Sequence, residues 1–264
     1  MELTRKYQKL LERLREAEGV LVAFSGGIDS SLLLKAALLA NSRVLAVTGS
    51  SPLRPRRELA AACELVKELG APHLVIETTE LADPEFRQNP ENRCYLCKKR
   101  LCTQLKAIAQ EHGLELVADG SNVDDLGEYR PGMQALLESG VVSPLAEVGL
   151  AKREIRQLAR ELALPNWDKP SAPCLATRFP YHTALTSEAL AQVENGEAAL
   201  EELGFSQFRL RHHGTIARIE VPPAEFETLL AAREKILAAL KPLGYQFVTL
   251  DLEGFRSGCF DQRR

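Results

Sequence analysis

The stretch GVLVAFSGGIDSSLLLKAALLA, residues 19–40, joins an apolar run to a helical pattern through two adjacent glycines and an acid. It predicts a buried strand, a tight turn and a helix. Glycines in such a turn let backbone N–H groups point inward, and the helix N-terminus adds partial positive charge, so the turn suits phosphate oxygens. An ordinary tight turn with Asp29 as helix N-cap is the alternative. The pattern G-x-x-x-x-G-K-[ST] is absent.

Apolar, strand-like runs alternate with helical patterns on the C-terminal side of this turn. The runs are 43–49, 73–79, 114–120 and 141–145, and the helical patterns are 55–70, 97–113 and 151–164. This rhythm predicts an α/β fold with a doubly wound parallel sheet. Ligands of such sheets bind beyond the carboxyl ends of the strands, where residues 24–31 and 119–125 both fall.

A proline-rich segment interrupts the alternation. Residues 164–183 contain four prolines in twenty positions, which predicts a connector without long regular structure. A helix, two strands, a second helix and a last strand are expected after it, as a small α+β domain with one apolar and one ionic sheet face. The expected division is therefore residues 1–163, a connector over 164–185, and a second domain over 186–264.

Composition limits the setting and the partners. The 264 residues carry a formal charge of −3, which gives no general attraction to nucleic acid. The first sixteen residues are too polar for a signal peptide, and no apolar run approaches membrane length. We therefore expect a cytoplasmic protein that binds neither nucleic acid nor membrane. Its six cysteines are then candidates for metal binding or catalysis rather than disulfides.

The loop SGGIDS resembles the SGGxDS signature of the PP-loop ATP pyrophosphatases. Members of that superfamily split ATP between its α and β phosphates, adenylate a substrate and release pyrophosphate. The resemblance implies that ATP and Mg²⁺ are cofactors and that Asp29 lies near the magnesium ion. The implied nucleotide-binding residues are Ser25, Gly26, Gly27, Asp29 and Ser30, to which we add Gly120 from the loop over 119–125.

Later stretches resemble the LarE family of ATP-dependent sulfur transferases, which mature the nickel-pincer nucleotide cofactor of lactate racemase. The matching stretches are NRCYLCKKRL, DGSNVDDLGEYRPG, SPLAEVGLAKREIR, NWDKPSAPCLATRFPY, RLRHHGTIARIEV and DLEGFRSG. The resemblance implies a pyridinium dicarboxylate mononucleotide as substrate, whose carboxylates are adenylated and become thiocarboxylates. It also implies a homo-oligomer, by analogy.

Cysteine chemistry distinguishes two versions of this family. Cys174 occupies the position of the sulfur-bearing cysteine, which one version consumes, leaving dehydroalanine. This chain also carries Cys94 and Cys97 as a C-x-x-C motif. Three thiolates suit a [4Fe-4S] cluster with one iron lacking a protein ligand, so we expect the cluster and a sulfide donor that the sequence does not identify. A zinc site, a redox pair or buried packing are the alternatives for the C-x-x-C motif.

The remaining assignments concern the substrate and the other cysteines. The resemblance implies a phosphate clamp made by Arg209 and Arg211, supported by Glu197, Glu220 and Asp251; a solvated ionic face is the alternative. Packing is expected for Cys63, Cys102 and Cys259. The rival functions are a tRNA thiolase of the PP-loop class, which the acidic charge disfavours, and a non-catalytic nucleotide sensor.

Overall fold

A computed structural model describes residues 2–41, 43–126, 131–170 and 172–256. Contacts divide the chain into two compact units, which we call the first unit (1–80 and 92–172) and the second unit (81–91 and 173–264). The expected connector over 164–185 is divided: residues up to 172 belong to the first unit and residues from 173 onward to the second. Residues 81–91 also belong to the second unit. No helix among the described residues is long and apolar enough to span a membrane.

The first unit is built on a four-stranded parallel sheet. Its strands are β1 (Val20–Ala23), β2 (Val44–Ser50), β3 (His73–Glu77) and β4 (Leu116–Ala118). Their order is β3-β2-β1-β4, so the chain moves outward from β1 and then returns to β4 on the other side of β1. This confirms the predicted parallel α/β fold. The point where the strand order reverses places the carboxyl ends of β1 and β4 side by side, where ligands of such sheets bind.

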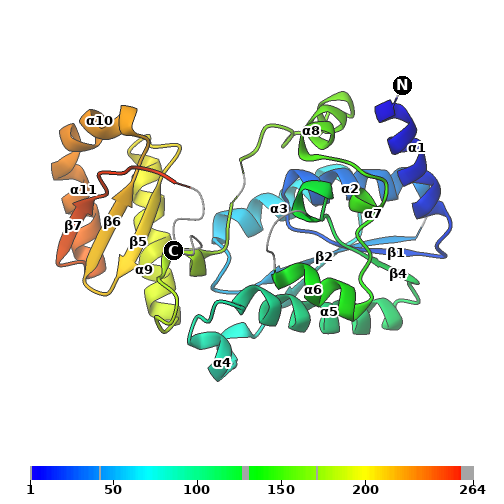
Figure 1. The fold of residues 1–264 in the computed structure, drawn as a ribbon, viewed down its shortest axis with the longest axis horizontal. Helices are drawn as coiled ribbons and strands as arrows, with labels where there is room; N and C mark the ends of the chain where they lie inside the picture. Colours follow the sequence, from blue (N-terminus) through cyan, green and yellow to red (C-terminus); the bar gives the residue numbers. More distant parts are fainter. Residues whose placement is uncertain (1, 42, 127–130, 171, 257–264) are drawn as a thin grey trace. The chain divides into compact units, whose positions relative to one another are not determined.

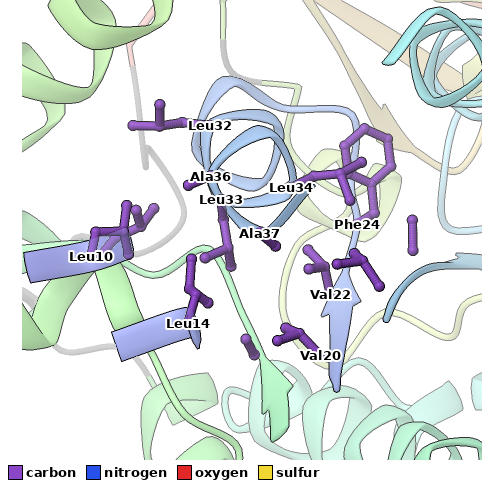
Figure 2. Packing of buried hydrophobic residues seen from close by; sticks show 14 of the residues in the cluster. Leu10, Leu14, Val20, Val22, Phe24, Leu32, Leu33, Leu34, Ala36 and Ala37 are labelled. Carbon is purple, nitrogen blue, oxygen red and sulfur yellow. The ribbon is translucent and has the colours of Figure 1, made fainter. Parts of the chain in front are cut away.

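Helices cover both faces of this sheet (Figure 1). They are α1 (Glu2–Arg15), α2 (Ile28–Ala40), α3 (Arg56–Leu69), α5 (Arg93–Glu111), α6 (Pro131–Ser139), α7 (Pro144–Glu147) and α8 (Lys152–Glu161). Side chains of β1 alternate between two cores: Val20 and Val22 pack with α1, α2, α3 and α8, whereas Leu21 packs with α5 and α6. Figure 2 shows apolar side chains of α1, α2 and β1 gathered in the first of these cores. Burial on both faces explains the nearly continuous apolar runs of the strands.

The second unit contains a three-stranded sheet of order β5-β6-β7. Its elements are α4 (Pro84–Arg87), α9 (Ser187–Glu202), β5 (Arg209–His213), β6 (Ile216–Glu220), α10 (Phe226–Ala231), α11 (Arg233–Leu240) and β7 (Phe247–Leu250). β5 and β6 are antiparallel, and β6 and β7 are parallel. A Cβ atom at Gly196 would lie 2.7 Å from Leu210 Cδ1, so this glycine lets α9 lie close against β5.

Short 3₁₀ helices complete the described chain. They are η1 (Glu80–Ala82), η2 (Val123–Leu126), η3 (Leu175–Arg178), η4 (Pro223–Glu225) and η5 (Lys241–Leu243). Pro222 precedes η4, Pro223 opens it, and Pro242 is the second residue of η5; the fixed φ of proline suits a first turn, where its missing N–H is not needed.

Candidate active site

Hydroxyl groups of the loop between β1 and α2 form hydrogen bonds within the loop. Ser25 Oγ lies 3.1 Å from Ser30 Oγ, which donates to the Gly27 carbonyl at 3.0 Å. Gly26 has φ +70°, and a Cβ atom there would lie 2.8 Å from Ala62 Cβ on α3, so both conformation and space require glycine. Gly27 is the N-cap of α2, which removes the alternative of Asp29 as N-cap.

Asp29 lies in the first turn of α2, where two other segments converge on it. Its Oδ2 accepts a hydrogen bond from Lys152 Nζ at 2.5 Å, and its Oδ1 accepts one from Asn122 Nδ2 at 3.4 Å. The backbone N–H of Lys152 donates to Asp124 Oδ2 at 2.7 Å, which fixes the start of α8 beside the loop after β4. Asp29 and Lys152 are both partly exposed and can therefore meet a ligand.

Lys152 was not among the site residues expected from the sequence. The first turn of a helix favours acidic side chains, because the N-terminus carries partial positive charge. A lysine at the first position of α8 is therefore electrostatically unfavourable unless an anion lies nearby, and this signal was present in the stretch AKREIR.

Asp119 and Gly120 join β4 to this site. Asp119 is buried, and it accepts hydrogen bonds from Ser143 Oγ at 2.7 Å, Ser121 Oγ at 2.8 Å and Lys98 Nζ at 3.2 Å. Burial acts to raise the pKa of Asp119, but Lys98 and these hydrogen bonds together outweigh it and lower the pKa. A Cβ atom at Gly120 would lie 2.9 Å from Ser30 N, so glycine allows this loop to touch the first turn of α2.

The C-x-x-C motif opens α5 in the first unit. Cys94 is exposed and Cys97 is half-buried, and side chains three residues apart share a helix face. Cys97 Sγ lies 3.4 Å from Oε1 of Glu80, a buried carboxylate whose Oε2 has no hydrogen-bond partner among the described residues. Within the described chain, no group of three or more His, Cys, Asp and Glu side chains is close enough to hold a metal ion.

Cys174 belongs to the second unit, is exposed and immediately precedes η3. The Cys174 carbonyl accepts hydrogen bonds from Thr177 Oγ1 at 2.7 Å and Arg178 Nη1 at 3.4 Å, and the Pro173 carbonyl accepts one from the same Nη1 at 3.1 Å. Arg178 is itself held by Glu197 through two hydrogen bonds of 2.8 and 2.9 Å, and both side chains are buried. This buried pair therefore fixes the backbone that carries Cys174.

Removing this buried ion pair is expected to destabilise the fold and loosen the Cys174 segment. Arg178→Met should lower the free energy of unfolding by about 3–5 kcal/mol, because it leaves Glu197 buried without its cation. Urea unfolding measures this change, and the alkylation rate of Cys174, followed by mass spectrometry of its peptide, should rise.

Arg233→Met is the matched control, because Arg233 forms an exposed ion pair with Glu234 in the same unit. Exposed pairs contribute little, so stability should hardly change. Equal effects of the two substitutions would contradict a special role for Arg178.

The other three cysteines were expected to be packing residues. Cys102 is buried among apolar side chains, and burial raises the pKa of its thiol, which confirms the packing role. Cys63 is half-buried on α3. Cys259 lies outside the described residues.

The predicted phosphate clamp lies on β5, and its two arginines have different surroundings. Arg211 is buried, makes hydrogen bonds of 2.9 and 2.8 Å to Glu220, and donates to the Thr177 carbonyl at 2.7 Å. Arg209 lies over the Phe255 ring at 5.0 Å from its centroid. The ionic face of β5 is thus buried at Arg211 rather than solvated.

Charge is unevenly compensated around Arg209. Burial lowers its pKa to about 10, and the neighbouring cations Arg178 and Arg211 contribute to the shift. Arg218 bridges Glu220 at 3.1 Å and Asp251 at 3.4 Å, so these carboxylates already have cationic partners. An anionic ligand beside Arg209 would offset the burial of its guanidinium and the repulsion from Arg178 and Arg211, which Glu197 and Glu220 already oppose.

A parallel α/β sheet with an SGGxDS loop at its switch point defines a nucleotide-binding protein of the PP-loop class. The family model described as NAD synthase matches residues 3–177. The chain is 41% identical over 258 residues to the pyridinium-3,5-bisthiocarboxylic acid mononucleotide synthase of Lactiplantibacillus plantarum, covering 97% of this chain and 94% of that protein.

Two uncharacterized proteins are also similar along their length. One, from Synechocystis sp., is 40% identical over 97% of both chains. The other, from Methanocaldococcus jannaschii, is 30% identical over 97% of this chain and 100% of its own. The chain therefore belongs to the LarE family of PP-loop ATP pyrophosphatases, and it is an ATP-dependent sulfurtransferase.

Proposed function

We propose that this enzyme converts a carboxylate of a pyridinium dicarboxylate mononucleotide into a thiocarboxylate, with release of AMP and pyrophosphate. The observation that carries the proposal is the 41% identity to a pyridinium-3,5-bisthiocarboxylic acid mononucleotide synthase across 97% of the chain. A carboxylate is a poor electrophile, and adenylation gives it AMP as a leaving group that a sulfur nucleophile can displace.

ATP is proposed to bind at the loop between β1 and α2. Amides at the start of a helix lack intrahelical acceptors and attract phosphate oxygens. The proposed nucleotide-binding residues are Ser25, Gly26, Gly27, Ser30 and Gly120, with Asp29 holding Mg²⁺. The Lys152 ammonium group, 2.5 Å from Asp29, supplies further positive charge close to the expected phosphates.

The substrate phosphate is proposed to bind at Arg209 in the second unit. The support is the largely buried position of the Arg209 guanidinium beside Arg178 and Arg211, together with its stacking on the Phe255 ring. Arg211 is proposed to complete the clamp from its buried position, where Glu220 on β6 orients its guanidinium. Asp251, which follows β7, pairs with Arg218. Glu197 fixes Arg178 and through it Cys174.

The sulfur is proposed to come through a [4Fe-4S] cluster held by Cys94, Cys97 and Cys174. The donor set fits this group, because soft thiolates suit iron–sulfur clusters and two of the thiols are exposed. Such a cluster would supply sulfur without consuming a cysteine of the chain. The chain's own contribution is to present Cys94 and Cys97 on one face of α5 and to hold the Cys174 backbone through Arg178.

The proposed setting follows from the substrate. A small nucleotide-like molecule is proposed as the ligand, with no nucleic acid or membrane partner, in the cytoplasm of the cell. Assembly into a homo-oligomer, with the second unit as substrate and oligomerisation domain, is proposed by analogy with the family.

A direct assay tests the proposed function. Purified enzyme, given ATP, Mg²⁺, a sulfide source and pyridinium dicarboxylate mononucleotide, should form AMP, pyrophosphate and a thiocarboxylate detectable by mass spectrometry. Arg209→Ala should weaken binding of the mononucleotide about ten-fold or more, since a charge-assisted pair contributes about 1.5–3 kcal/mol, and should leave ATP binding unchanged. Pyrophosphate release that requires tRNA instead of the mononucleotide would overturn the proposal.

A further inference from the structure

Three consecutive carbonyl groups of the loop between β1 and α2 accept hydrogen bonds from side chains that lie outside the SGGxDS motif. Arg54 Nη2 donates to the Ser25 carbonyl at 2.6 Å. Asn166 Nδ2 donates to the Gly26 carbonyl at 3.1 Å. Ser31 Oγ donates to the Gly27 carbonyl at 2.9 Å and accepts a hydrogen bond from the same Asn166 Nδ2 at 3.0 Å.

These contacts fix the direction of the loop's N–H groups. The described chain contains no cis peptide bond, and in a planar trans peptide the C=O and the following N–H point in opposite directions. Holding the carbonyls of Ser25 and Gly26 therefore fixes the direction of the Gly26 and Gly27 N–H groups, the second of which also donates to Ser25 Oγ at 3.3 Å. The positive φ of Gly26 is the left-handed conformation that one residue of a concave anion site of successive N–H groups adopts.

Without these donors, the loop could rotate a peptide and turn a carbonyl oxygen toward the phosphates, where it would repel them. Glycine offers little resistance to such a rotation, and two glycines are adjacent here. Arg54 is well placed to prevent it, because its guanidinium is also fixed by the carbonyls of Gly49 at 3.4 Å and Glu58 at 3.2 Å. Asn166 Oδ1 is buried with no hydrogen-bond partner among the described residues, so the contacts of this side-chain amide with the loop are all made by its Nδ2 group.

We infer that Arg54 and Asn166 are positioning residues that orient the loop amides for the pyrophosphate portion of ATP. The inference rests on the proposed binding of ATP at this loop. Arg54 reaches the loop from the turn before α3, and Asn166 reaches it from a segment 140 residues away in sequence. Both residues belong to the first unit, and both act through the backbone, so they need not touch the nucleotide.

The test compares two ligands that share the nucleotide site but differ in phosphate. Calorimetry should measure the dissociation constants of inorganic pyrophosphate, with Mg²⁺, and of adenosine for wild type, Arg54→Lys and Asn166→Leu. Arg54→Lys keeps the positive charge and loses the planar fork, so it separates orientation from electrostatics. Each variant should bind pyrophosphate roughly ten-fold more weakly and adenosine within about two-fold of wild type.

Lys169→Gln is the matched control. Lys169 anchors the segment that carries Asn166 through a 2.7 Å hydrogen bond to Glu58 on α3, and within the described chain it does not contact a loop carbonyl. Its loss should leave pyrophosphate binding within about two-fold of wild type, because Lys169 donates to Glu58 and not to the loop. An equal loss in Lys169→Gln and Asn166→Leu would overturn the inference, because anchoring of the segment would then explain both.

The remaining outcomes separate this inference from the proposed function. Unchanged pyrophosphate affinity in Arg54→Lys and Asn166→Leu, with a wild type that binds it, would overturn the inference alone. A wild type that binds neither pyrophosphate nor ATP would overturn the proposed ATP site itself. If either variant fails to fold, Ser31→Ala tests the same arrangement with a smaller change, and it should weaken pyrophosphate more than adenosine.

Discussion

Cys94→Ala, Cys97→Ala and Cys174→Ala are each expected to abolish multiple turnovers with added sulfide. The physical reason is that each proposed ligand supplies one of three thiolates, and loss of any one leaves too few for a stable cluster. Anaerobically reconstituted wild type should contain about four irons per chain, and each variant should contain less. Iron analysis and product counting per chain measure the two effects independently.

Cys63→Ala and Cys102→Ala are the matched controls. Cys63 is half-buried and Cys102 is buried in an apolar core, and neither belongs to the C-x-x-C motif. Both variants should retain the iron content of wild type, although Cys102→Ala should be less stable because it leaves a cavity.

A sacrificial cysteine would give a different result. In that route the Cys174 sulfur displaces AMP to form a thioester, and elimination at its Cβ–S bond then releases the thiocarboxylate. One turnover per chain, with a loss of about 34 Da as Cys174 becomes dehydroalanine, would establish it. Cys94→Ala and Cys97→Ala would then retain their single turnover, and the cluster proposal would be wrong.

Asp29→Asn is expected to reduce pyrophosphate release by about a hundred-fold or more, because a metal ion that stabilises developing charge contributes several kcal/mol to the transition state. The substitution keeps the shape of the side chain and removes the charge that would hold Mg²⁺. The protein should remain folded, since the Asp29 carboxylate is partly exposed and its contacts are with the side chains of Lys152 and Asn122. A coupled assay for pyrophosphate, titrated with Mg²⁺, measures the change.

Glu161→Gln is the control for the loss of one carboxylate in the same unit. Glu161 is exposed at the end of α8 and contacts Gln157 at 2.9 Å. Its rate should match that of wild type. Near-normal pyrophosphate release by Asp29→Asn would show that Asp29 is not the magnesium ligand.

Local sequence patterns predicted the parts of this protein that depend on near neighbours. The apolar run over 19–23, the two glycines and the helical pattern after them are adjacent in sequence, and they form β1, the loop and α2 as expected. The alternation of strands and helices likewise predicted the parallel sheet, since β1, β4 and most of β2 are buried on both faces. Matching of the SGGxDS loop to its superfamily predicted the class of chemistry.

Those local patterns could not predict which side chains far apart in the sequence form hydrogen bonds with each other. Lys152 lies 123 residues from Asp29, and Asn166 lies 140 residues from Gly26. Nothing local marks which lysine or asparagine will reach the loop, because that depends on how β4, α8 and the following segment pack around the switch point of the sheet. Arg211 illustrates the same limit, because alternation placed it on an ionic face but did not predict its burial against Glu220.

The sequence by itself therefore determined the α/β fold, the nucleotide loop and the cysteines that are candidates for sulfur chemistry, because each is encoded by residues close together in the chain. Only the tertiary structure decided which side chains hold them. It brought Arg54 and Asn166 to the loop carbonyls and Glu197 to Arg178. A hydrogen bond needs its donor and acceptor within about 3 Å, and folding alone brings such separated groups so close.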